Sequence, residues 1–475
     1  EYERTVTTVL NEAVKARTAD YFARLRDGVA ERGIDAPLYV MHSGGGIFGV
    51  EAAISYALRT VLSGPAAGAV GAREASADVG IQNAIGLDMG GTSADVSLVE
   101  DGKLVRSTEG EINDLPIKTP LIDINTVGAG GGSVAWVDAG GGLRVGPASA
   151  GADPGPICYG RGGERPTVTD AQVLLGRIDP GAFADGDRRS LVDRVLGVIQ
   201  RDLAEPLSVT PEEAAVSVLQ VANAKMAREL RRVTVERGRD PDDFALVAFG
   251  GAGPLHAPAV ARHVGLETVI VPRSPGVLSA RGLLLADVRM DESAATRTTA
   301  LDPSTLETQF ASLEETITDR LRDGGFDPAA AMLRRTVDMR YRGQSYELQV
   351  PFDGGVIDEA TLESLRDRFD DRHAQRYGHA MPGEPVEIVT LRVAGSVEMP
   401  GLEEQRSSVE ERSMNQRSVQ FAEGQPRETA VHDRAGFDPG TELDGPAIIE
   451  HTGSTALIPP GMTGWVAASG ALVIE

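Results

Sequence analysis

Cysteine and long apolar runs are scarce in this sequence, and each shortage excludes a class of protein. The only cysteine is Cys158, which excludes an intramolecular disulfide and a zinc site built from cysteines. No run of about 18 apolar residues occurs, so no membrane-spanning helix is expected. No basic and then apolar leader opens the sequence, and we therefore expect a cytoplasmic protein.

Lysine is also scarce, and acidic residues outnumber basic ones. The lysines are Lys15, Lys103, Lys118 and Lys225, and the formal net charge is -24 at pH 7. A surface this acidic repels nucleic acid and anionic membranes, so we expect neither as a partner. The acidic residues of such a surface also repel one another, and concentrated salt screens this repulsion. Acidic, lysine-poor surfaces are therefore suited to concentrated salt. We therefore expect a halophilic source; a protein that is simply acidic is the alternative.

The length and the order of the predicted elements indicate more than one domain. At about 150 residues per domain, 475 residues correspond to two or three domains. Apolar strands alternate with helical patterns over residues 1–290, which predicts an α/β domain. Residues 291–302 are polar and rich in threonine, as in a linker. Strand-like alternation predominates beyond them, so residues 291–475 predict a smaller, β-rich α+β domain.

Three long helices are predicted. Residues 1–32 show helical spacing without a preceding capping residue, so we expect the chain to begin inside a longer protein or to be one subunit of it. The helix 211–238 has Thr210 as its cap and two acids in its first turn, at the positive end of the helix dipole. The third helix is predicted over residues 303–324.

A hairpin with a glycine-rich bend contains the strongest candidate site. The apolar strand 84–87 leads into the bend, and the strand 96–99 leads out of it. Between them stands the run Asp88-Met89-Gly90-Gly91-Thr92-Ser93-Ala94-Asp95. The two glycines let the backbone approach a phosphate, to which their N–H groups and the hydroxyls of Thr92 and Ser93 can donate. An ordinary glycine turn is the alternative, but the complete pattern favours a phosphate site.

Two acids flank this bend. Asp88 ends a buried strand, where its carboxylate can hold Mg²⁺ or orient the waters of the ion, because hard cations prefer carboxylate and water. Asp95 begins the returning strand. We predict that Asp88 and Asp95 are the catalytic residues and that Asp88 is the metal ligand.

A second glycine loop follows another buried strand, residues 245–249. At such a junction of strand, loop and helix, a nucleotide can lie against bare backbone and the helix N-terminus. Alone the signal is weak, because α/β folds place glycine at many such turns. Since this loop follows the phosphate hairpin, we expect the nucleoside side of the ligand to contact Gly250, Gly251, Ala252 and Gly253.

Seven motifs, in order along the chain, resemble the hydantoinase A/5-oxoprolinase family. They are residues 42–46, 62–69, 88–95, 128–133, 149–160, 166–171 and 249–256. The resemblance extends from residue 1 to about 290. Residues 445–450 and 459–461 are similar to the C-terminal domain of the family.

The resemblance implies a fold, cofactors and a reaction. The fold is an α/β, actin/hexokinase-like (ribonuclease H-like) ATPase core, of which this chain holds one half, and the cofactors are ATP and Mg²⁺. The reaction is ATP-dependent hydrolysis of a cyclic amide (hydantoin, N-methylhydantoin or 5-oxoproline), in which the lactam oxygen is phosphorylated and water then attacks. A subunit of an ATP-dependent ketone carboxylase is the nearest alternative, and a truncated, non-catalytic scaffold subunit is another.

The resemblance also implies partners. Members of the family begin with another domain that carries its own Asp-x-Gly-Gly-Thr loop, and only one such hairpin stands here. We therefore expect a separate N-terminal ATPase half, a hydantoinase B-like subunit and an oligomeric enzyme.

Further residues are candidates for contact with substrate, each with a structural alternative. They are His42, Ser43, Asp123, Gly130, Gly131, Ser133 and His256. His42 is either a ligand or a loop histidine satisfied by backbone, and His256 is either a ligand or a capped surface histidine. Related sequences often have histidine where Asn125 stands, which argues against a second metal.

Four other residues are expected to be structural. Cys158 has no His or Lys close in sequence and is expected to be a buried, unreactive thiol. Asp170 is expected to cap the chain beside a glycine-rich turn. His373 and His379 lack a third zinc ligand and are expected on the surface.

Overall fold

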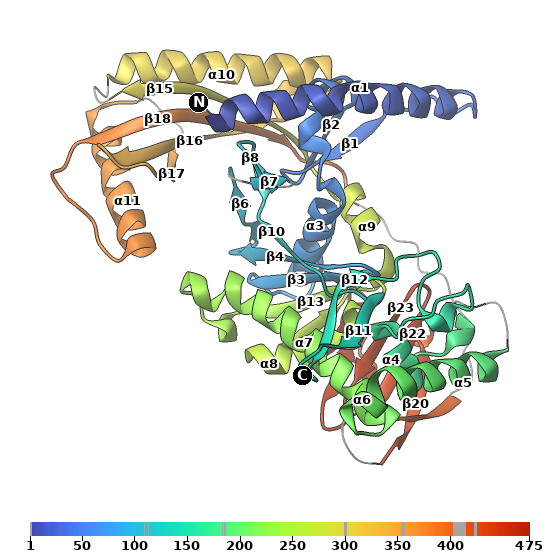
Figure 1. Cartoon of the computed structure of the whole chain (residues 1–475). Coiled ribbons are helices and arrows are strands. Elements are labelled where there is room, and N and C mark those ends of the chain that lie inside the picture. Colours follow the sequence, from blue (N-terminus) through green and yellow to red (C-terminus); the bar gives the residue numbers. More distant parts are fainter. Residues whose placement is uncertain are drawn as a thin grey trace. The chain divides into compact units, whose positions relative to one another are not determined.

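A computed structural model describes residues 2–108, 110–112, 114–182, 184, 187–298, 302–352, 357–401, 415–421 and 425–475. The chain forms two compact units, each assembled from three stretches of sequence (Figure 1). Unit 1 comprises Glu1–Ser63, Thr108–Pro120 and Leu285–Gly401, and unit 2 comprises Gly64–Ser107, Leu121–Leu284 and Leu402–Glu475. None of the described helices combines the length and the apolar character that crossing a bilayer requires.

Unit 1 is built on a mostly antiparallel sheet with the strand order β1-β2-β15-β18-β16-β17. In that order the strands are Tyr39–His42, Gly46–Gly49, Val288–Thr298, Val386–Val397, Met332–Tyr341 and Leu348–Phe352. The helices are α1 (Tyr2–Ala30), α2 (Val50–Ser55), α10 (Pro303–Asp323) and α11 (Glu359–Tyr377). Strand β7 (Gly110–Ile112) pairs with β8 (Leu115–Ile117).

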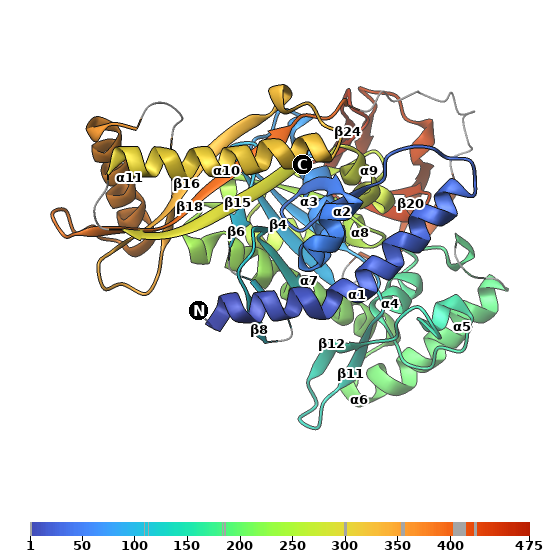
Figure 2. The same cartoon turned by 90° about the horizontal axis from the view of Figure 1, so that it is seen from above.

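Helix α10 runs along this sheet (Figures 1 and 2) because one stripe of its surface is apolar. The side chains of the stripe are buried at intervals of three and four residues: Leu306, Phe310, Leu313, Ile317 and Leu321. Asp302 caps the helix by accepting from the Thr305 N–H at 3.0 Å. The helices predicted at 303–324 and 1–32 are confirmed by α10 and α1.

The linker predicted at residues 291–302 is wrong over residues 291–298. These residues belong to β15, which pairs antiparallel with β18. The polar composition was misleading because the charges are neutralised within the unit: Asp291 accepts from Arg289 at 2.6 Å, and Glu292 is paired with Arg320. Residues 299–301 lie outside the described residues. The predicted boundary after residue 290 falls inside β15.

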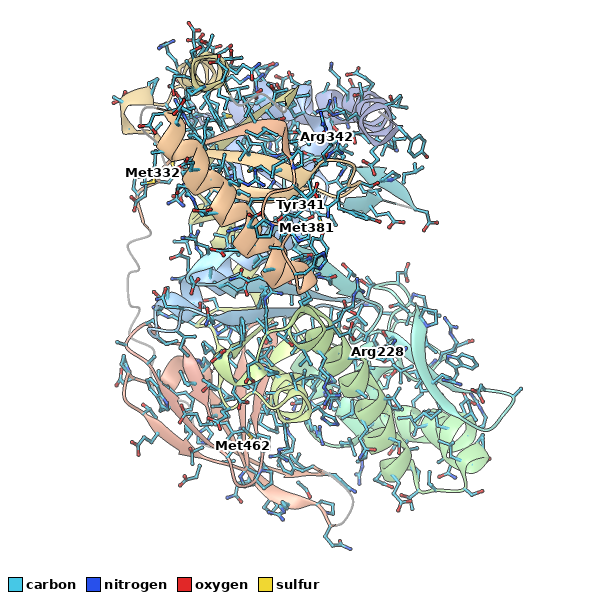
Figure 3. The ribbon with its side chains drawn as sticks, turned by 90° about the vertical axis from the view of Figure 1, so that its left-hand side faces the viewer. Arg228, Met332, Tyr341, Arg342, Met381 and Met462 are labelled. Atoms are coloured by element: carbon cyan, nitrogen blue, oxygen red, sulfur yellow. The ribbon has the colours of Figure 1, made fainter. Side chains whose placement is uncertain are left out.

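The surface position predicted for His373 is also wrong, whereas His379 is exposed as predicted. His373 is buried on α11, and its Nδ1 donates to the His379 carbonyl oxygen at 2.6 Å. Its ring packs edge-on against Tyr341, with 4.8 Å between the centroids. The Tyr341 hydroxyl accepts from the Met381 N–H at 2.8 Å, and both residues are labelled in Figure 3. His373 therefore belongs to the core of unit 1.

Unit 2 is built on a mixed sheet with the strand order β10-β4-β3-β13-β14-β25-β24-β21 and β5 beside β4. In that order the strands are Ile124–Val127, Ala94–Glu100, Ala84–Met89, Ala245–Phe249, Val269–Val271, Leu472–Ile474, Thr463–Val466, Glu442–Asp444 and Lys103–Leu104. Strands β3, β13 and β14 are parallel and almost wholly buried, as expected where helices cover both faces of a sheet. The mixed α/β class is confirmed.

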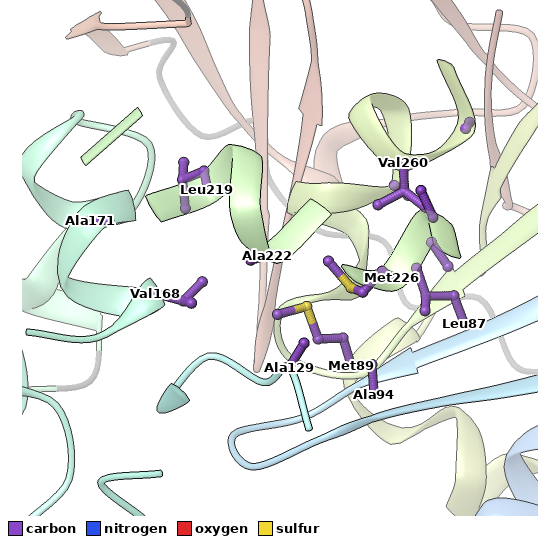
Figure 4. Close-up of a cluster of buried hydrophobic side chains, with 14 of the residues drawn as sticks. Leu87, Met89, Ala94, Ala129, Val168, Ala171, Leu219, Ala222, Met226 and Val260 are labelled. Carbon is purple, nitrogen blue, oxygen red and sulfur yellow. The ribbon is translucent and has the colours of Figure 1, made fainter. Parts of the chain in front are cut away.

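Helices cover the two faces of this sheet. They are α3 (Ser63–Ala77) and α9 (Leu278–Leu284) on one face, and α7 (Pro211–Val233) and α8 (Gly253–Val264) on the other. Leu87 and Met89 of β3 share a core with Met226 of α7 and Val260 of α8 (Figure 4). Because side chains alternate along a strand, Asp88 faces the opposite side, toward α9.

Smaller elements complete unit 2. A second sheet has the order β19 (Asn415–Val419), β20 (Arg427–Asp433), β22 (Ala447–His451) and β23 (Ser454–Ile458). Strand β6 (Arg106–Ser107) pairs with β9 (Leu121–Ile122), and β11 (Ser133–Val137) pairs with β12 (Leu143–Ser149). The remaining helices are α4 (Val168–Leu174), α5 (Arg188–Ile199) and α6 (Glu205–Leu207).

Candidate functional site

The predicted glycine-rich hairpin is present in unit 2. Strands β3 and β4 pair antiparallel, and Asp88 lies directly opposite Asp95. Residues 90–93 form the bend, in which the Gly90 N–H donates to the Ser93 carbonyl oxygen at 3.1 Å. The bend is exposed at Gly90, Gly91 and Thr92. A ligand can therefore approach its backbone directly.

A neighbouring loop fixes the orientation of this bend. The N–H of Gly131 donates to the Gly90 carbonyl oxygen at 2.9 Å, and the N–H of Gly132 donates to that of Gly91 at 2.6 Å. In a trans peptide the C=O and the following N–H point in opposite directions. The N–H groups of Gly91 and Thr92 therefore point away from the loop, and neither has an acceptor in the described part of the chain.

The close fit of this loop explains its glycines. A Cβ atom on Gly130 would lie 2.6 Å from the Ser93 nitrogen. Ser133 closes the loop, because its hydroxyl accepts from the Gly130 N–H at 2.8 Å. The predicted residues Gly130, Gly131 and Ser133 thus lie beside the predicted bend, and they order two unpaired donors of the kind that bind phosphate oxygens.

The two acids at the base of the bend are half-buried and repel each other. Burial, and then the charge of Asp95, raise the pKa of Asp88 to about 6; a weak hydrogen bond from the Ser279 hydroxyl at 3.4 Å opposes them. Burial also raises the pKa of Asp95, against a hydrogen bond from the Thr126 hydroxyl at 2.6 Å. A cation would relieve this repulsion.

The donor set suits magnesium. Mg²⁺ usually takes one or two carboxylates and fills its other positions with phosphate and water. Among the described residues no cluster of three or more His, Cys, Asp or Glu side chains is arranged to hold a metal by itself. The pair Asp88 and Asp95 therefore fits a cation that arrives with a phosphate ligand.

The second predicted loop lies against the first site. Gly250 follows β13, whose last residue, Phe249, is in register with Asp88. Gly250 has a φ of +78°, and a Cβ atom there would lie 2.5 Å from the Asp88 Oδ1. The Ala252 N–H donates to the Met89 carbonyl oxygen at 3.0 Å. Gly253 then begins α8, which has no side-chain cap and whose first residues are buried.

Asp123 and His256 have polar partners outside the bend. Asp123 precedes β10, at the end opposite the 128–133 loop, and forms an ion pair with Arg237. His256 is buried, so the alternative of a capped surface histidine is wrong. Its Nδ1 donates to Asn223 at 2.6 Å, and its Nε2 accepts from Gln172 at 3.1 Å. Burial, assisted by the charge of Arg177, lowers the pKa of His256 to about 3 and keeps the ring neutral.

His42 and Ser43 belong to unit 1. The His42 Nδ1 accepts from the Gly44 N–H at 3.0 Å, and its Nε2 donates to the Arg289 carbonyl oxygen at 3.2 Å. Burial lowers the pKa of His42 to about 3, helped by Arg59 and Arg289 and opposed by Asp291. His42 is thus neutral, and both of its ring nitrogens are hydrogen-bonded to main-chain groups. The Ser43 hydroxyl is buried without a hydrogen-bond partner among the described residues.

The expectations for Cys158 and Asp170 are confirmed. Cys158 is buried, and burial together with the charge of Asp170 raises the pKa of its thiol, so it is unreactive. Asp170 caps α4 in a capping box with Thr167, and it also accepts from the Cys158 N–H at 2.8 Å. The sequence alone did not point to Thr126 or Ser279, which donate to Asp95 and Asp88; only the register of β10 and the position of α9 bring them there.

The chain is similar to proteins of known function. The family model described as hydantoinase/oxoprolinase matches residues 4–292, and the one described as the hydantoinase/oxoprolinase C-terminal domain matches residues 293–470. The caprolactamase subunit alpha of Pseudomonas jessenii is 34% identical over 97% of this chain, which covers 68% of that subunit. The 5-oxoprolinase 1 of Arabidopsis thaliana is 32% identical over 99% of this chain, which covers 38% of that protein.

Two solved structures resemble the whole chain. The ATP-dependent caprolactamase from Pseudomonas jessenii matches 100% of it with a TM-score of 0.84 and 32% identity, and this chain covers 70% of that structure. The nucleotide-free structure of acetone carboxylase, an enzyme of ATP-dependent acetone carboxylation, matches 100% of it with a TM-score of 0.78 and 25% identity, with 69% of that chain covered. Both family models and these relatives span nearly all of the sequence, and the chain therefore belongs to the hydantoinase/oxoprolinase family.

Proposed function

We propose that this chain is the ATP-binding subunit of an enzyme that hydrolyses a cyclic amide. One observation carries the proposal: the bend at residues 90–93 presents two oriented, unpaired N–H groups beside a pair of mutually repelling carboxylates. Such a bend suits the terminal phosphates of a nucleotide together with its magnesium ion. The caprolactamase of Pseudomonas jessenii, whose structure is described as ATP-dependent, supports both the nucleotide and the class of substrate.

Each part of the proposed site has a distinct role. The N–H groups of Gly91 and Thr92 and the hydroxyls of Thr92 and Ser93 donate to phosphate oxygens. Asp88 and Asp95 hold Mg²⁺ or its waters, and the ion supplies charge neutralisation when it is bound. The loop 250–253 receives the nucleoside side. The two loops beside parallel strands also support an actin/hexokinase-like core, which we propose for unit 2.

The proposed reaction opens the ring in three steps: phosphorylation, ring opening and hydrolysis of an acyl phosphate. The lactam oxygen attacks the γ-phosphorus of ATP, the bond to the β–γ bridging oxygen breaks, and ADP leaves. Water adds to the lactam carbon, the ring C–N bond breaks, and the nitrogen takes up a proton. A second water hydrolyses the resulting acyl phosphate to a carboxylate and phosphate. Phosphorylation is required because a lactam carbonyl is a poor electrophile.

Ketone carboxylation is the second candidate. The likeness to acetone carboxylase, with a TM-score of 0.78, favours it, since the same phosphate site can activate an enolate and bicarbonate instead of a lactam. For either reaction we propose that the chain works with a hydantoinase B-like subunit and an N-terminal ATPase half. Curated relatives described as subunits, such as the caprolactamase subunit alpha, support an assembly of more than one chain.

Substrate-stimulated phosphate release tests the proposal. The reconstituted complex should be assayed with hydantoin, N-methylhydantoin, 5-oxoproline, caprolactam, and acetone with bicarbonate. We expect stimulation by one cyclic amide and its loss in Asp88→Asn, because that change removes the metal-binding charge without changing the shape of the side chain. The control is Asp242→Asn, an exposed acid of unit 2. Full activity in Asp88→Asn contradicts the assigned site, and stimulation by ketone alone selects the second candidate.

A further inference from the structure

A hairpin turn from the C-terminal part of the chain lies on the proposed nucleoside loop. Strands β22 and β23 are joined by the turn at residues 451–454. Ser454 is 7% exposed, and its hydroxyl donates to the Gly250 carbonyl oxygen at 3.1 Å, across 204 positions of sequence. A Cβ atom on Gly276 would lie 2.8 Å from the Gly453 carbonyl oxygen, and one on Gly251 would lie 3.5 Å from it. The turn therefore contacts both the 250–253 loop and the segment after β14.

This contact fixes the peptide group between Gly250 and Gly251. The Gly250 N–H donates to the Pro275 carbonyl oxygen at 2.9 Å, and the Gly250 carbonyl accepts from Ser454, so the residue is held at both ends. Because the carbonyl points to Ser454, the Gly251 N–H points the opposite way. That N–H has no acceptor in the described part of the chain, and Gly251 is exposed. The hydrogen bond thus orients a third unpaired donor.

One large aliphatic residue beside the segment that the turn touches is exposed. Val277 follows Gly276, which the turn touches, and is 59% exposed although it is a large aliphatic residue. The turn itself exposes Thr452 and Gly453 and carries no acid. A flat, uncharged group with polar edges suits such surroundings better than a phosphate does, and the base and ribose of a nucleotide are groups of that kind.

We propose that the turn at residues 451–454 supports the nucleoside subsite from behind, with Ser454 as the positioning residue that directs the Gly251 N–H toward the nucleoside. The inference rests on the proposed ATP site and extends it to the C-terminal sheet of unit 2. It assigns the recognition of the nucleoside, and not of the phosphates, to the contact between this turn and the 250–253 loop.

Nucleotide affinity compared with the affinity for inorganic tripolyphosphate tests the proposal. Titration calorimetry on the full chain, with magnesium and in concentrated KCl, gives both values. We expect Ser454→Ala to lower the affinity for ATP and ADP roughly five- to tenfold, which is the effect of losing one neutral hydrogen bond. The affinity for tripolyphosphate should stay unchanged. Ser454→Thr, which keeps the hydroxyl, restores most of the affinity. In the active complex, the KM for ATP rises while kcat changes little.

The control is Ser418→Ala, the same chemical change at an exposed position of the same four-stranded sheet. A second variant, Gly276→Ala, pushes the turn away through its Cβ and leaves the Ser454 hydroxyl intact. We expect it to lower the affinity for ATP but not the affinity for tripolyphosphate. This variant decides the question if Ser454→Ala fails to fold.

Three outcomes overturn the inference. If the affinity for ATP is unchanged in both variants, the turn has no part in nucleotide binding. If the affinities for ATP and for tripolyphosphate fall equally, the contact contributes to general stability or to phosphate binding, and not to nucleoside binding. Absence of nucleotide binding by the unmodified chain and by its complex instead contradicts the proposed function itself, and this result is distinct from the other two.

Discussion

At the scale of the residue, Asp88 combines a cost in stability with a gain in binding. Its carboxyl has a pKa of about 6 in the folded protein, because burial and the neighbouring Asp95 disfavour the charge. Its ordinary value of 3.8 applies to the unfolded chain. Above pH 6 the folded protein therefore carries an unfavourable charge that a cation compensates, and below that pH the carboxyl takes up a proton.

We predict that Asp88→Asn stabilises the metal-free protein at pH 7.5, by up to about 3 kcal/mol. The gain should shrink as the pH falls from 6 to 4, because the wild-type carboxyl is then protonated in the folded state and the difference from asparagine disappears. Denaturant unfolding in the presence of a chelator, at a series of pH values, measures it. Asp242→Asn should show no such gain, and a gain for Asp88→Asn that is independent of pH would contradict the stated cause.

Gly250 is a second residue at which geometry sets function. Gly250→Ala should abolish nucleotide binding, because its Cβ would lie 2.5 Å from the Asp88 carboxylate and displace it. Gly238 offers a matched control: its φ of +77° is nearly the same, and a Cβ there meets nothing within 4 Å. Gly238→Ala should cost only the strain of the left-handed backbone, about 1–2 kcal/mol, and keep nucleotide affinity. Equal loss of affinity in both variants would refute the role of the contact.

Part of the candidate site could be predicted from the sequence because its pattern is local. The bend at residues 90–93 and the loop at 250–253 each follow a short buried strand, and glycine spacing marks both. Ser279 and Ser454 could not be found in this way, since their partners Asp88 and Gly250 are about two hundred positions away and meet them only through strand order. The burial of His256 could not be found either, because its two polar partners lie on other helices.

At the scale of the element, helix starts were predicted well because caps act within one turn. Thr210 caps α7 as predicted, and the structure shows that it does so in a capping box with Glu213. We predict that Thr210→Ala lowers the free energy of unfolding by about 1 kcal/mol, since the Glu213 N–H then loses its acceptor. Ser217→Ala, inside the same helix, should be neutral or slightly stabilising, because alanine is the better helix former. Thermal unfolding of the two variants separates these expectations, and equal effects would argue against the cap.

Elements stabilised by distant partners were predicted less well. The polar composition of residues 291–298 suggested a linker, yet β18 pairs with them along most of their length. Helix α11 was not predicted, because charged residues mask its buried stripe of Leu362, Leu365 and Phe369. Local composition determines neither case, since β18, the partner strand of β15, and the residues against which the stripe of α11 packs come from elsewhere in the chain.

At the scale of the whole molecule, the net charge of -24 opposes folding at low ionic strength. We propose a salt-adapted protein and predict that its unfolding temperature rises between 0.1 and about 2 M KCl, because screening shortens the range of the repulsion. Asp88→Asn should show the same rise, since the effect belongs to the entire surface and not to the site. An unfolding temperature that stays constant or falls with salt would contradict this prediction.

The position of β25 has a consequence for synthesis on the ribosome. Strand β14 pairs with β13 on one side and with β25, residues Leu472–Ile474, on the other. When residues 84–271 have been translated, the proposed nucleotide loops already exist, but one edge of β14 stays without its neighbour until residues 472–474 emerge from the exit tunnel. Over that interval the nascent chain presents a row of unpaired main-chain groups, which makes it a client for chaperones and vulnerable to self-association.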